Sequence, residues 1–494
     1  MWLTQLLERN RQCFPDRAAL VDEHRGVTWA EFDDRTAELA RGLADLGIRR
    51  GDRVAVLSLD RIEVLESYFA LARLGALFVP LNHSLAAPEV AGIIERVGAV
   101  AVLGESELLD RHASLPDCVR LRVALDKPAF TALGTVTGPA PLPEVADTDP
   151  VAVLHTSATT GRAKGVTVDP ASFRAIGLGW LAVAGPTDDI VMVNCCPLYH
   201  GSMVVSLTYM AAGATIVLMP GFTPQRALAA VERHRATHMW LVPQMLRFTL
   251  QAKAAHGTDL SSLREILYGA APMPPEVYAE GASRLGCGFR QVYGMTEVGG
   301  PFVTLGPDEH PAPGDLTARI PCGRVIPGMS ARAADNRGRE VPRGEIGEIV
   351  VRGPGMMQGY WNDPEATEEV RLDGWIRTGD LGFVDEGGRI HLVDRSKDLI
   401  IRAGQNVYPS EIERALMTHP SVRDAAVVGI PDEDYGEVPL AYVVAENGTD
   451  TRVLLAHLAE NLAPYKRPRR IEFIEQVPRN PAGKIIKKQL RERV

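Results

Sequence analysis

The chain has 494 residues, a formal net charge of −9, 46% hydrophobic residues and 23% charged residues. This length indicates more than one folding unit, and the composition is that of an ordinary globular protein. A mildly acidic chain does not favour a nucleic-acid backbone or an anionic membrane as a partner. We therefore expect neither nucleic-acid binding nor a membrane span.

The first residues, MWLTQLLERN, lack the basic segment and the apolar core of a secretion signal. Residues 190–225 contain no Asp, Glu, Lys or Arg, but Pro and Gly interrupt them. They predict a buried helix near 203–212 and a buried strand at 214–219 rather than a membrane span. The six Cys show no zinc-site or disulfide spacing, so a cytoplasmic location is predicted.

Helical and strand patterns alternate in the first 150 residues. A helix is predicted over 28–47, because Thr28 and Glu31 have the spacing of a capping box. Buried apolar runs predict strands and a further helix, in chain order strand 53–59, helix 64–75, strand 76–81 and a strand near residue 100. This alternation is typical of α/β layers with largely parallel strands.

The pattern changes later in the chain. Residues 126–150 are rich in Pro, Gly and Thr and predict a surface connection, and 325–395 predict short strands with Gly-rich turns. After Arg395 a helix, two strands, a helix and a strand predict a compact α+β unit. We expect an α/β protein with a large N-terminal domain (1–395) that includes a small β-barrel-like part, and a small mobile α+β C-terminal domain (396–494).

The strongest local signal is TSATTGRAKG at 156–165, which directly follows a predicted strand. Its hydroxyls and small residues allow backbone N–H and side-chain O–H groups to surround phosphate oxygens, and Lys164 adds positive charge. It is not a Walker motif. Considered alone, the segment is also compatible with a solvated polar turn.

The segment resembles the phosphate loop, T-S-G-T-T-G-x-P-K-G, of the ANL superfamily, which contains acyl-CoA synthetases, peptide-synthetase adenylation domains and firefly luciferase. Ala158 and Ala163 depart from that pattern. Ala adopts a positive φ less freely than Gly, so the change at 158 affects loop mobility more than phosphate contact. The resemblance implies that the nucleotide is contacted by Thr156, Ser157, Thr159, Thr160, Gly161 and Lys164. It also implies that Thr156 and Lys164 are catalytic.

Two later segments, YGAAP at 268–272 and YGMTE at 293–297, resemble the pair that encloses adenine in the same family. The resemblance implies that Tyr293 stacks on adenine and that Glu297 is a catalytic ligand of Mg²⁺, a cation that carboxylates bind well. In isolation Glu297 is more typical of a solvated surface carboxylate, and its position inside YGMTE reverses that interpretation. The remaining implied nucleotide contacts are Gly269, Ala270, Ala271, Pro272, Gly294 and Thr296.

Further similarities reach the end of the chain. Asp380 and Arg395 resemble the family's ribose-binding residues, and Lys397 stands where relatives carry the hinge between the two domains. Gly404 is implied to flank the channel for the pantetheine of coenzyme A. Lys484 matches the adenylation lysine, whose ammonium would neutralise the charge that grows as a carboxylate attacks phosphorus.

The pocket for the acid is implied by two segments, 199–203 and 236–245. His200 is compatible with a gate to the acyl site and equally with a core histidine. The second segment contains no acidic residue to pair an ammonium, so an aryl or medium-chain aliphatic acid is favoured over an amino acid. The predicted pocket residues are Tyr199, His200, Met203, Trp240, Tyr268 and Met295.

The resemblance implies a ligase that uses ATP and Mg²⁺ to convert a carboxylic acid to its acyl-adenylate and then transfers the acyl group to coenzyme A. One alternative keeps the first step but uses a carrier-protein thiol, an amine or another small nucleophile as acceptor. A second, suggested by Ala158 and Ala163, is a degenerate nucleotide-binding protein without catalysis. A luciferase-like oxygenation would share the same adenylation motifs.

Overall fold

The computed structural model describes residues 1–134, 142–156, 163–184, 189–199, 201–252, 257–315, 320–479 and 484–493. The chain forms two compact units. Unit 1 contains residues 1–330 and 352–376, and unit 2 contains residues 331–351 and 377–494. The chain therefore leaves unit 1, returns to it for one short stretch, and ends in unit 2.

A nine-stranded sheet forms one part of unit 1, in the order β15-β14-β13-β12-β11-β9-β10-β1-β2. Its central strands from β13 to β1 are parallel, and the outer pairs are antiparallel. The strands are β1 (Ala18–Val21), β2 (Gly26–Thr28), β9 (Val191–Asn194), β10 (Thr215–Leu218), β11 (His238–Leu241), β12 (Glu265–Gly269), β13 (Gly288–Met295), β14 (Gly300–Leu305) and β15 (Arg324–Val325).

A seven-stranded sheet forms the second part, in the order β18-β8-β7-β4-β3-β5-β6. Strands β7, β4, β3, β5 and β6 are parallel, whereas β8 is antiparallel to both of its neighbours. The strands are β3 (Arg53–Leu57), β4 (Leu77–Pro80), β5 (Ala101–Gly104), β6 (Leu121–Ala124), β7 (Ala152–His155), β8 (Gly165–Val168) and β18 (Gly359–Tyr360).

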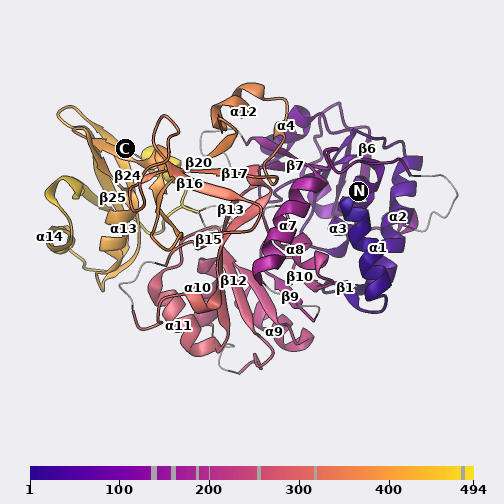
Figure 1. Cartoon of the computed structure of the whole chain (residues 1–494), viewed down its shortest axis with the longest axis horizontal. Helices are drawn as coiled ribbons and strands as arrows, with labels where there is room; N and C mark the ends of the chain where they lie inside the picture. Colours follow the sequence, from indigo (N-terminus) through magenta and orange to yellow (C-terminus); the bar gives the residue numbers. More distant parts are fainter. Residues whose placement is uncertain are drawn as a thin grey trace. The chain divides into compact units, whose positions relative to one another are not determined.

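Helices cover both sheets (Figure 1). Apolar side chains of α9 (Pro224–His234), α10 (Pro243–Gln251) and α11 (Pro275–Leu285) form one core with the nine-stranded sheet. Those of α4 (Ala87–Val97) and α5 (Ser106–Arg111) form another core with the seven-stranded sheet. The remaining long helices pack on one another and against strands of both sheets: α1 (Trp2–Cys13), α2 (Trp29–Asp45), α3 (Ile62–Leu74), α7 (Pro170–Ala184) and α8 (Ser202–Ala211).

Several sequence predictions for unit 1 are confirmed. Helix α2 begins after Thr28, whose hydroxyl accepts a hydrogen bond from Glu31 N at 3.2 Å while Glu31 Oε2 accepts one from Thr28 N at 2.8 Å. The charge-free stretch forms α8, which is almost entirely buried, and the buried strand β10. None of the helices in the described part of the chain has the length and apolar character that a membrane crossing requires.

The surface connection predicted over 126–150 is in part helical. Helix α6 (Pro128–Leu133) lies within it, because Pro128 stands at the first helical position and Phe130 is fully buried. A buried aromatic side chain supplies the apolar contact that a short helix needs. The high content of Pro, Gly and Thr in this stretch gave no sign of the buried Phe130.

Unit 2 contains the predicted C-terminal elements. Antiparallel strands form a sheet in the order β23-β22-β25-β24, with β26 parallel to β25. Side chains of α13 and α14 cover one face of it, and Leu490 of α15 lies in the core on the other. The elements are β22 (Ile400–Arg402), β23 (Gln405–Val407), α13 (Pro409–Met417), β24 (Val422–Asp432), β25 (Gly436–Ala445), α14 (Thr451–Asn461), β26 (Arg470–Phe473) and α15 (Lys487–Arg491).

A further five-stranded sheet contains the short strands predicted for 325–395, in the order β16-β17-β20-β19 with β21 beside β20. The predicted turn at 385–388 joins β20 and β21. The division between the two units falls within β20, after Ile376. A domain boundary near Lys397 stays a prediction. The strands are β16 (Ser330–Ala334), β17 (Gly347–Arg352), β19 (Arg371–Leu372), β20 (Trp375–Val384) and β21 (Ile390–Arg395).

Candidate active site

The two ends of the predicted phosphate loop are joined at its base. Strands β7 and β8 are antiparallel neighbours with His155 opposite Gly165, and Thr156 N donates a hydrogen bond to Lys164 O at 3.0 Å. Thr156 and Lys164, which flank the predicted phosphate contacts, are therefore adjacent at one end of this strand pair. The predicted contacts Ser157, Thr159, Thr160 and Gly161 lie outside the described residues.

The side chain of Lys164 lies over an aromatic ring that the sequence analysis did not single out. Its Nζ is 4.9 Å from the ring centroid of Tyr360 and 3.6 Å from the carboxylate of Glu369. Lys164 is about one-third exposed, and Glu369 lies mostly in solvent. An ammonium over the face of an aromatic ring is attracted by the ring's electrons, so Tyr360 gives Lys164 a defined position.

The hydroxyl of the same tyrosine contacts Glu297, the predicted metal ligand. Tyr360 donates a hydrogen bond to Glu297 Oε1 at 2.9 Å, and both residues are 8% exposed. Burial and the negative charge of Glu297 raise the pKa of Tyr360. The structure therefore brings Lys164 and Glu297 together on one side chain. No sequence motif pointed to Tyr360, which is the second residue of the two-residue strand β18, in GYWND.

The Glu297 carboxylate suits a hard cation such as Mg²⁺, which prefers oxygen ligands and few protein ligands. Across the described residues there is no group of three or more His, Cys, Asp or Glu side chains placed to hold a metal. A magnesium ion at Glu297 would thus take its other ligands from water and from the phosphates of a bound nucleotide, as is usual for this ion. Glu297 fits that requirement.

The two segments predicted to enclose adenine lie at the ends of adjacent parallel strands. Gly269 of β12 is opposite Val292 of β13, which places residues 270–272 beside 293–296. Ala270 has a positive φ of 65°, and the Tyr293 ring lies 5.1 Å from that of Phe302. A Cβ at Gly294 would lie 2.2 Å from Gly300 O, so only glycine fits there. Ala271, Pro272 and Thr296 lie in the same two segments, each at least partly exposed.

The predicted pocket residues do not all share one face of the nine-stranded sheet. Tyr268 belongs to the core with α9–α11; its hydroxyl donates to Gln291 Oε1 at 3.0 Å and lies 2.8 Å from His310 Nε2. Trp240 is opposite Leu267 in the register, one residue before Tyr268, so its side chain faces the other way. Met203 is fully buried on α8, and Met295 ends β13. Tyr268 is therefore separated from Trp240 by the sheet.

On the Trp240 face, polar atoms are buried. Trp240 is 5% exposed and lies opposite Asn194 in the register of β11 and β9. Asn194 Oδ1 accepts a hydrogen bond from Ser202 Oγ at 2.6 Å. Among the described residues, Trp240 Nε1 and Asn194 Nδ2 have no hydrogen-bond partner. Two buried donors on one face are costly unless something accepts from them, so this face suits a ligand with a polar acceptor.

Tyr199 lies beside a buried carboxyl group that the sequence analysis missed. Its ring is 5.5 Å from that of His83, and Asp60 Oδ1 accepts a hydrogen bond from the preceding Leu198 N at 2.9 Å. Burial raises the pKa of Asp60 to about 8. Asp60 stands between a strand and a helix, where an acidic residue is usually a solvated cap, so no pattern indicated it. His200 lies outside the described residues.

The predicted ribose-binding residues meet in unit 2. Asp380 on β20 is opposite Arg395 on β21, and Arg395 Nε lies 2.7 Å from Asp380 Oδ1. Asp380 is 7% exposed, and its N–H donates to Thr378 Oγ1 at 3.1 Å. An ionised carboxylate only accepts hydrogen bonds, which suits Asp380 to sugar hydroxyls.

Three more predicted residues lie in unit 2. Burial and the nearby Arg395 and Arg491 lower the pKa of Lys397 to about 8, although Asp398 opposes this shift. Gly404 forms, with Ala403, the two-residue turn between β22 and β23, with φ values of 79° and 48°. Lys484 is exposed and directly precedes Ile485, which pairs with Arg479.

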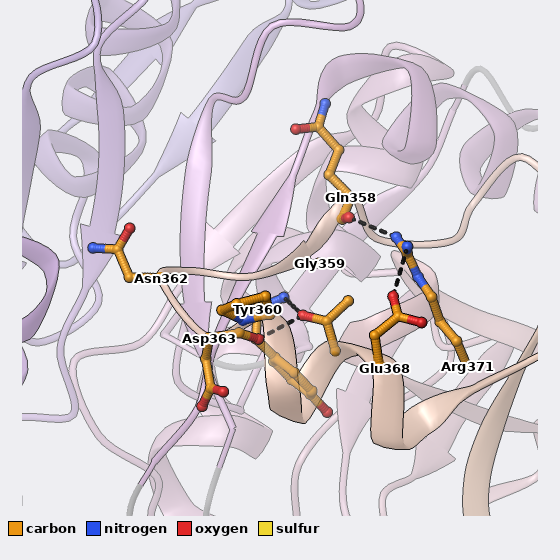
Figure 2. Close-up of a pocket in the computed structure, with 9 residues that line it drawn as sticks. Gln358, Gly359, Tyr360, Asn362, Asp363, Glu368 and Arg371 are labelled. Carbon is orange, nitrogen blue, oxygen red and sulfur yellow. Dashed lines mark hydrogen bonds and ion pairs between the residues drawn. The ribbon is translucent and has the colours of Figure 1, made fainter.

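A hollow of about 280 Å³ lies beside Tyr360, between β18 and α12 (Pro364–Val370) (Figure 2). Arg371 lines this hollow and contacts Gln358 O at 3.0 Å and Glu368 Oε1 at 3.3 Å. Asp363 caps α12 by accepting from Ala366 N at 3.0 Å. These contacts fix the segment that carries Tyr360.

Comparison with known proteins identifies the family. Residues 7–361 match the family model for AMP-binding enzymes, and residues 411–484 match that for the AMP-binding enzyme C-terminal domain. The first match covers well over half of the chain, so the protein belongs to the AMP-binding enzyme family, as the motifs predicted.

Relatives and a solved structure match over nearly the full length. A feruloyl-CoA synthase from Amycolatopsis is 38% identical over 98% of this chain and 97% of its own. A fatty acid–[acyl-carrier-protein] ligase from Streptomyces coeruleorubidus is 36% identical over 99% of this chain and 96% of its own. The O-succinylbenzoate coenzyme A synthetase of Bacillus subtilis, solved with AMP, superposes with a TM-score of 0.87 at 29% identity, and 98% of each chain is covered. The α/β fold with its C-terminal α+β part is thereby confirmed.

Proposed function

We propose that this protein activates a carboxylic acid with ATP, forming an acyl-adenylate and pyrophosphate, and then transfers the acyl group to the thiol of coenzyme A with release of AMP. The observation that carries the proposal is the meeting of Lys164 and Glu297 on Tyr360, beside the loop that follows β7. A cation and an anion held by one side chain suit the binding of Mg·ATP.

The first step needs charge stabilisation at the α-phosphate. Lys164 and the backbone and hydroxyls of the 156–165 loop would hold the phosphates, and Glu297 would bind Mg²⁺. When bound, this cation would neutralise phosphate charge. Lys484 would bridge the attacking carboxylate and the α-phosphate. Tyr293 would stack on adenine, and Asp380 and Arg395 would bind the ribose.

The second step needs a different residue set. We propose that the C-terminal domain, residues 396–494, turns about a hinge at Lys397, which removes Lys484 and brings Gly404 to the channel for pantetheine. A few backbone positions suffice to absorb such a rotation. The thiol would then attack the acyl carbonyl, and AMP would leave. A cytoplasmic location stays a prediction from the sequence.

We propose an aryl acid rather than an amino acid as substrate. No acidic side chain occurs in 236–245 to pair an ammonium. The face that carries Trp240 and Met203 is largely apolar, and the buried N–H groups of Trp240 and Asn194 suit a hydroxyl, methoxy or keto oxygen on the ring. The name of the 38% identical feruloyl-CoA synthase agrees with such an acid.

A second acceptor is supported by one observation. The 36% identical relative from Streptomyces is named a fatty acid–[acyl-carrier-protein] ligase. Because the two acceptors share a phosphopantetheine thiol, the same adenylation site would serve either one. Coenzyme A and a carrier protein are therefore the two acceptors to compare, and amines or other small nucleophiles rank below them.

The test is a pyrophosphate-release assay with Mg·ATP and a panel of aryl, medium-chain and amino-substituted acids. Each acid is run without acceptor, with coenzyme A, and with a phosphopantetheinylated carrier protein. We expect multiple turnovers with coenzyme A and a thioester of the matching mass. Turnover with the carrier protein but not with coenzyme A would identify the carrier protein as the acceptor. Absence of release with every acid would refute the ligase activity.

A further inference from the structure

The segment that carries Tyr360 contacts Glu297 at both its main chain and its side chain. Glu297 lies in a short helical turn, Thr296–Val298, directly after β13. Its carbonyl oxygen accepts a hydrogen bond from Met357 N at 2.8 Å, and its Oε1 accepts one from the Tyr360 hydroxyl at 2.9 Å. A carboxylate held in this way has one oxygen committed and a restricted rotamer.

The ring of Tyr360 contacts the second charged residue. Lys164 Nζ lies 4.9 Å from the ring centroid, at the point where the phosphate loop enters β8. Its ion pair with Glu369 at 3.6 Å is solvent-exposed and therefore weak. The buried ring is accordingly the more constant contact of the ammonium.

Tyr360 is itself fixed by the fold. Strand β18 pairs with β8, with Tyr360 opposite Val166, and Trp361 N donates to Gly165 O at 2.7 Å. The Tyr360 N–H donates to Thr367 Oγ1 at 2.9 Å, which ties it to α12 (Figure 2). The Tyr360 side chain thus projects from a strand that is hydrogen-bonded to β8 and to α12. This gives rigid support to the two charged groups.

We propose that Tyr360 is a positioning residue for nucleotide activation: its hydroxyl orients the Glu297 carboxylate, and its ring supports the Lys164 ammonium. In this role Tyr360 acts through these two residues. The inference rests on the proposed function, because it assigns Glu297 and Lys164 to the phosphates of Mg·ATP. It adds a residue that no adenylation motif of the sequence analysis contained.

Two substitutions separate the two roles. Tyr360→Phe removes the hydroxyl and keeps the ring under Lys164, whereas Tyr360→Leu removes both. Tyr435→Phe is a matched control, since Tyr435 is 41% exposed in unit 2. ATP affinity is measured by calorimetry during a Mg²⁺ titration, without any acid, and the acid-dependent pyrophosphate exchange is measured separately. Melting temperatures report whether each variant is folded.

For Tyr360→Phe we expect the Mg²⁺ concentration that gives half-maximal ATP affinity to rise roughly 10-fold, the loss typical of one charge-assisted hydrogen bond. Tyr360→Leu should also weaken ATP binding at saturating Mg²⁺. In a Glu297→Ala background, Tyr360→Phe should cause no further change. An equal loss in both backgrounds, or an unchanged Mg²⁺ requirement in folded Tyr360→Phe, would overturn the inference.

The calorimetric experiment distinguishes the inference from the proposed function. If wild type binds Mg·ATP but none of the acids leads to pyrophosphate release, the ligase proposal fails. The Mg²⁺ titration then still decides the role of Tyr360. If wild type binds no Mg·ATP, both fail together.

Discussion

Arg395 Nε lies 2.7 Å from Asp380 Oδ1, and the two residues are directly opposite each other on antiparallel strands. Asp380 is 7% exposed, so the carboxylate of this pair is largely buried. Its geometry is set by the backbone register rather than by long flexible side chains. Such a carboxylate accepts hydrogen bonds in a fixed direction, which suits a sugar with two neighbouring hydroxyls.

The first prediction concerns this carboxylate. Asp380→Ala should raise the KM for ATP roughly 10- to 100-fold, the cost of losing hydrogen bonds to a charged acceptor. The KM for the acid should change little. Steady-state pyrophosphate release with varied ATP checks this. Glu386→Ala, an exposed site in the turn of the same hairpin, is the control. A selective loss for the acid would contradict the ribose role.

The second prediction separates the two half-reactions. Lys484→Ala should lower acyl-adenylate formation by at least about 100-fold, because it removes a charge aimed at the transition state. Thioester formation from supplied acyl-adenylate and coenzyme A should remain near the wild-type rate. Lys488→Ala, at a lysine 61% exposed on the same terminal segment, serves as the control. Equal loss in both half-reactions in a folded variant would refute this role for Lys484.

The third prediction concerns the acid. Trp240→Ala makes room for a larger acid and removes a buried N–H. The ratio of kcat/KM for bulkier acids to kcat/KM for smaller acids should therefore rise about 10-fold. Trp240→Phe keeps most of the volume and should selectively weaken acids that carry a ring oxygen. The measurement is kcat/KM over the acid panel, with Trp375→Phe as control. An equal loss of kcat/KM for every acid would show that Trp240 does not line the acid pocket.

The fourth prediction concerns pH and Asp60. Its pKa is about 8 in the folded protein and 3.8 as the ordinary value. Below pH 4 the group is protonated in both states. As pH rises from about 4 to 8 only the unfolded state loses its proton, so the free energy of unfolding falls.

Asp60→Asn keeps an acceptor for Leu198 N and cannot ionise. Its stability relative to wild type should therefore increase through this pH range, reaching on the order of a few kcal/mol at pH 8. Melting temperatures between pH 5 and 8 give the comparison. Asp110→Asn, at a carboxylate 79% exposed, should show no such trend. A constant difference between Asp60→Asn and wild type at all pH values would show that Asp60 is ionised when buried.

Local patterns predicted most of the elements, because each depends on neighbours in the sequence. The capping box of α2 and the hairpin turn between β20 and β21 are examples. The Tyr360–Glu297 contact joins residues 63 positions apart, and it depends on long-range contacts such as the pairing of β18 with β8. The position of Tyr268 depends on the register between β11 and β12, which motif spacing does not contain.

The return of residues 352–376 to unit 1 has a consequence for synthesis. A chain emerging from the ribosome completes β8 long before β18 exists, so the outer edge of β8 stays unpaired for almost 200 residues of elongation, counted from Val168 to Gly359. An open strand edge invites association with other chains. Nascent chains from which β18 has not yet emerged should therefore depend on chaperones, whereas chains that expose β18 outside the ribosome can close this edge.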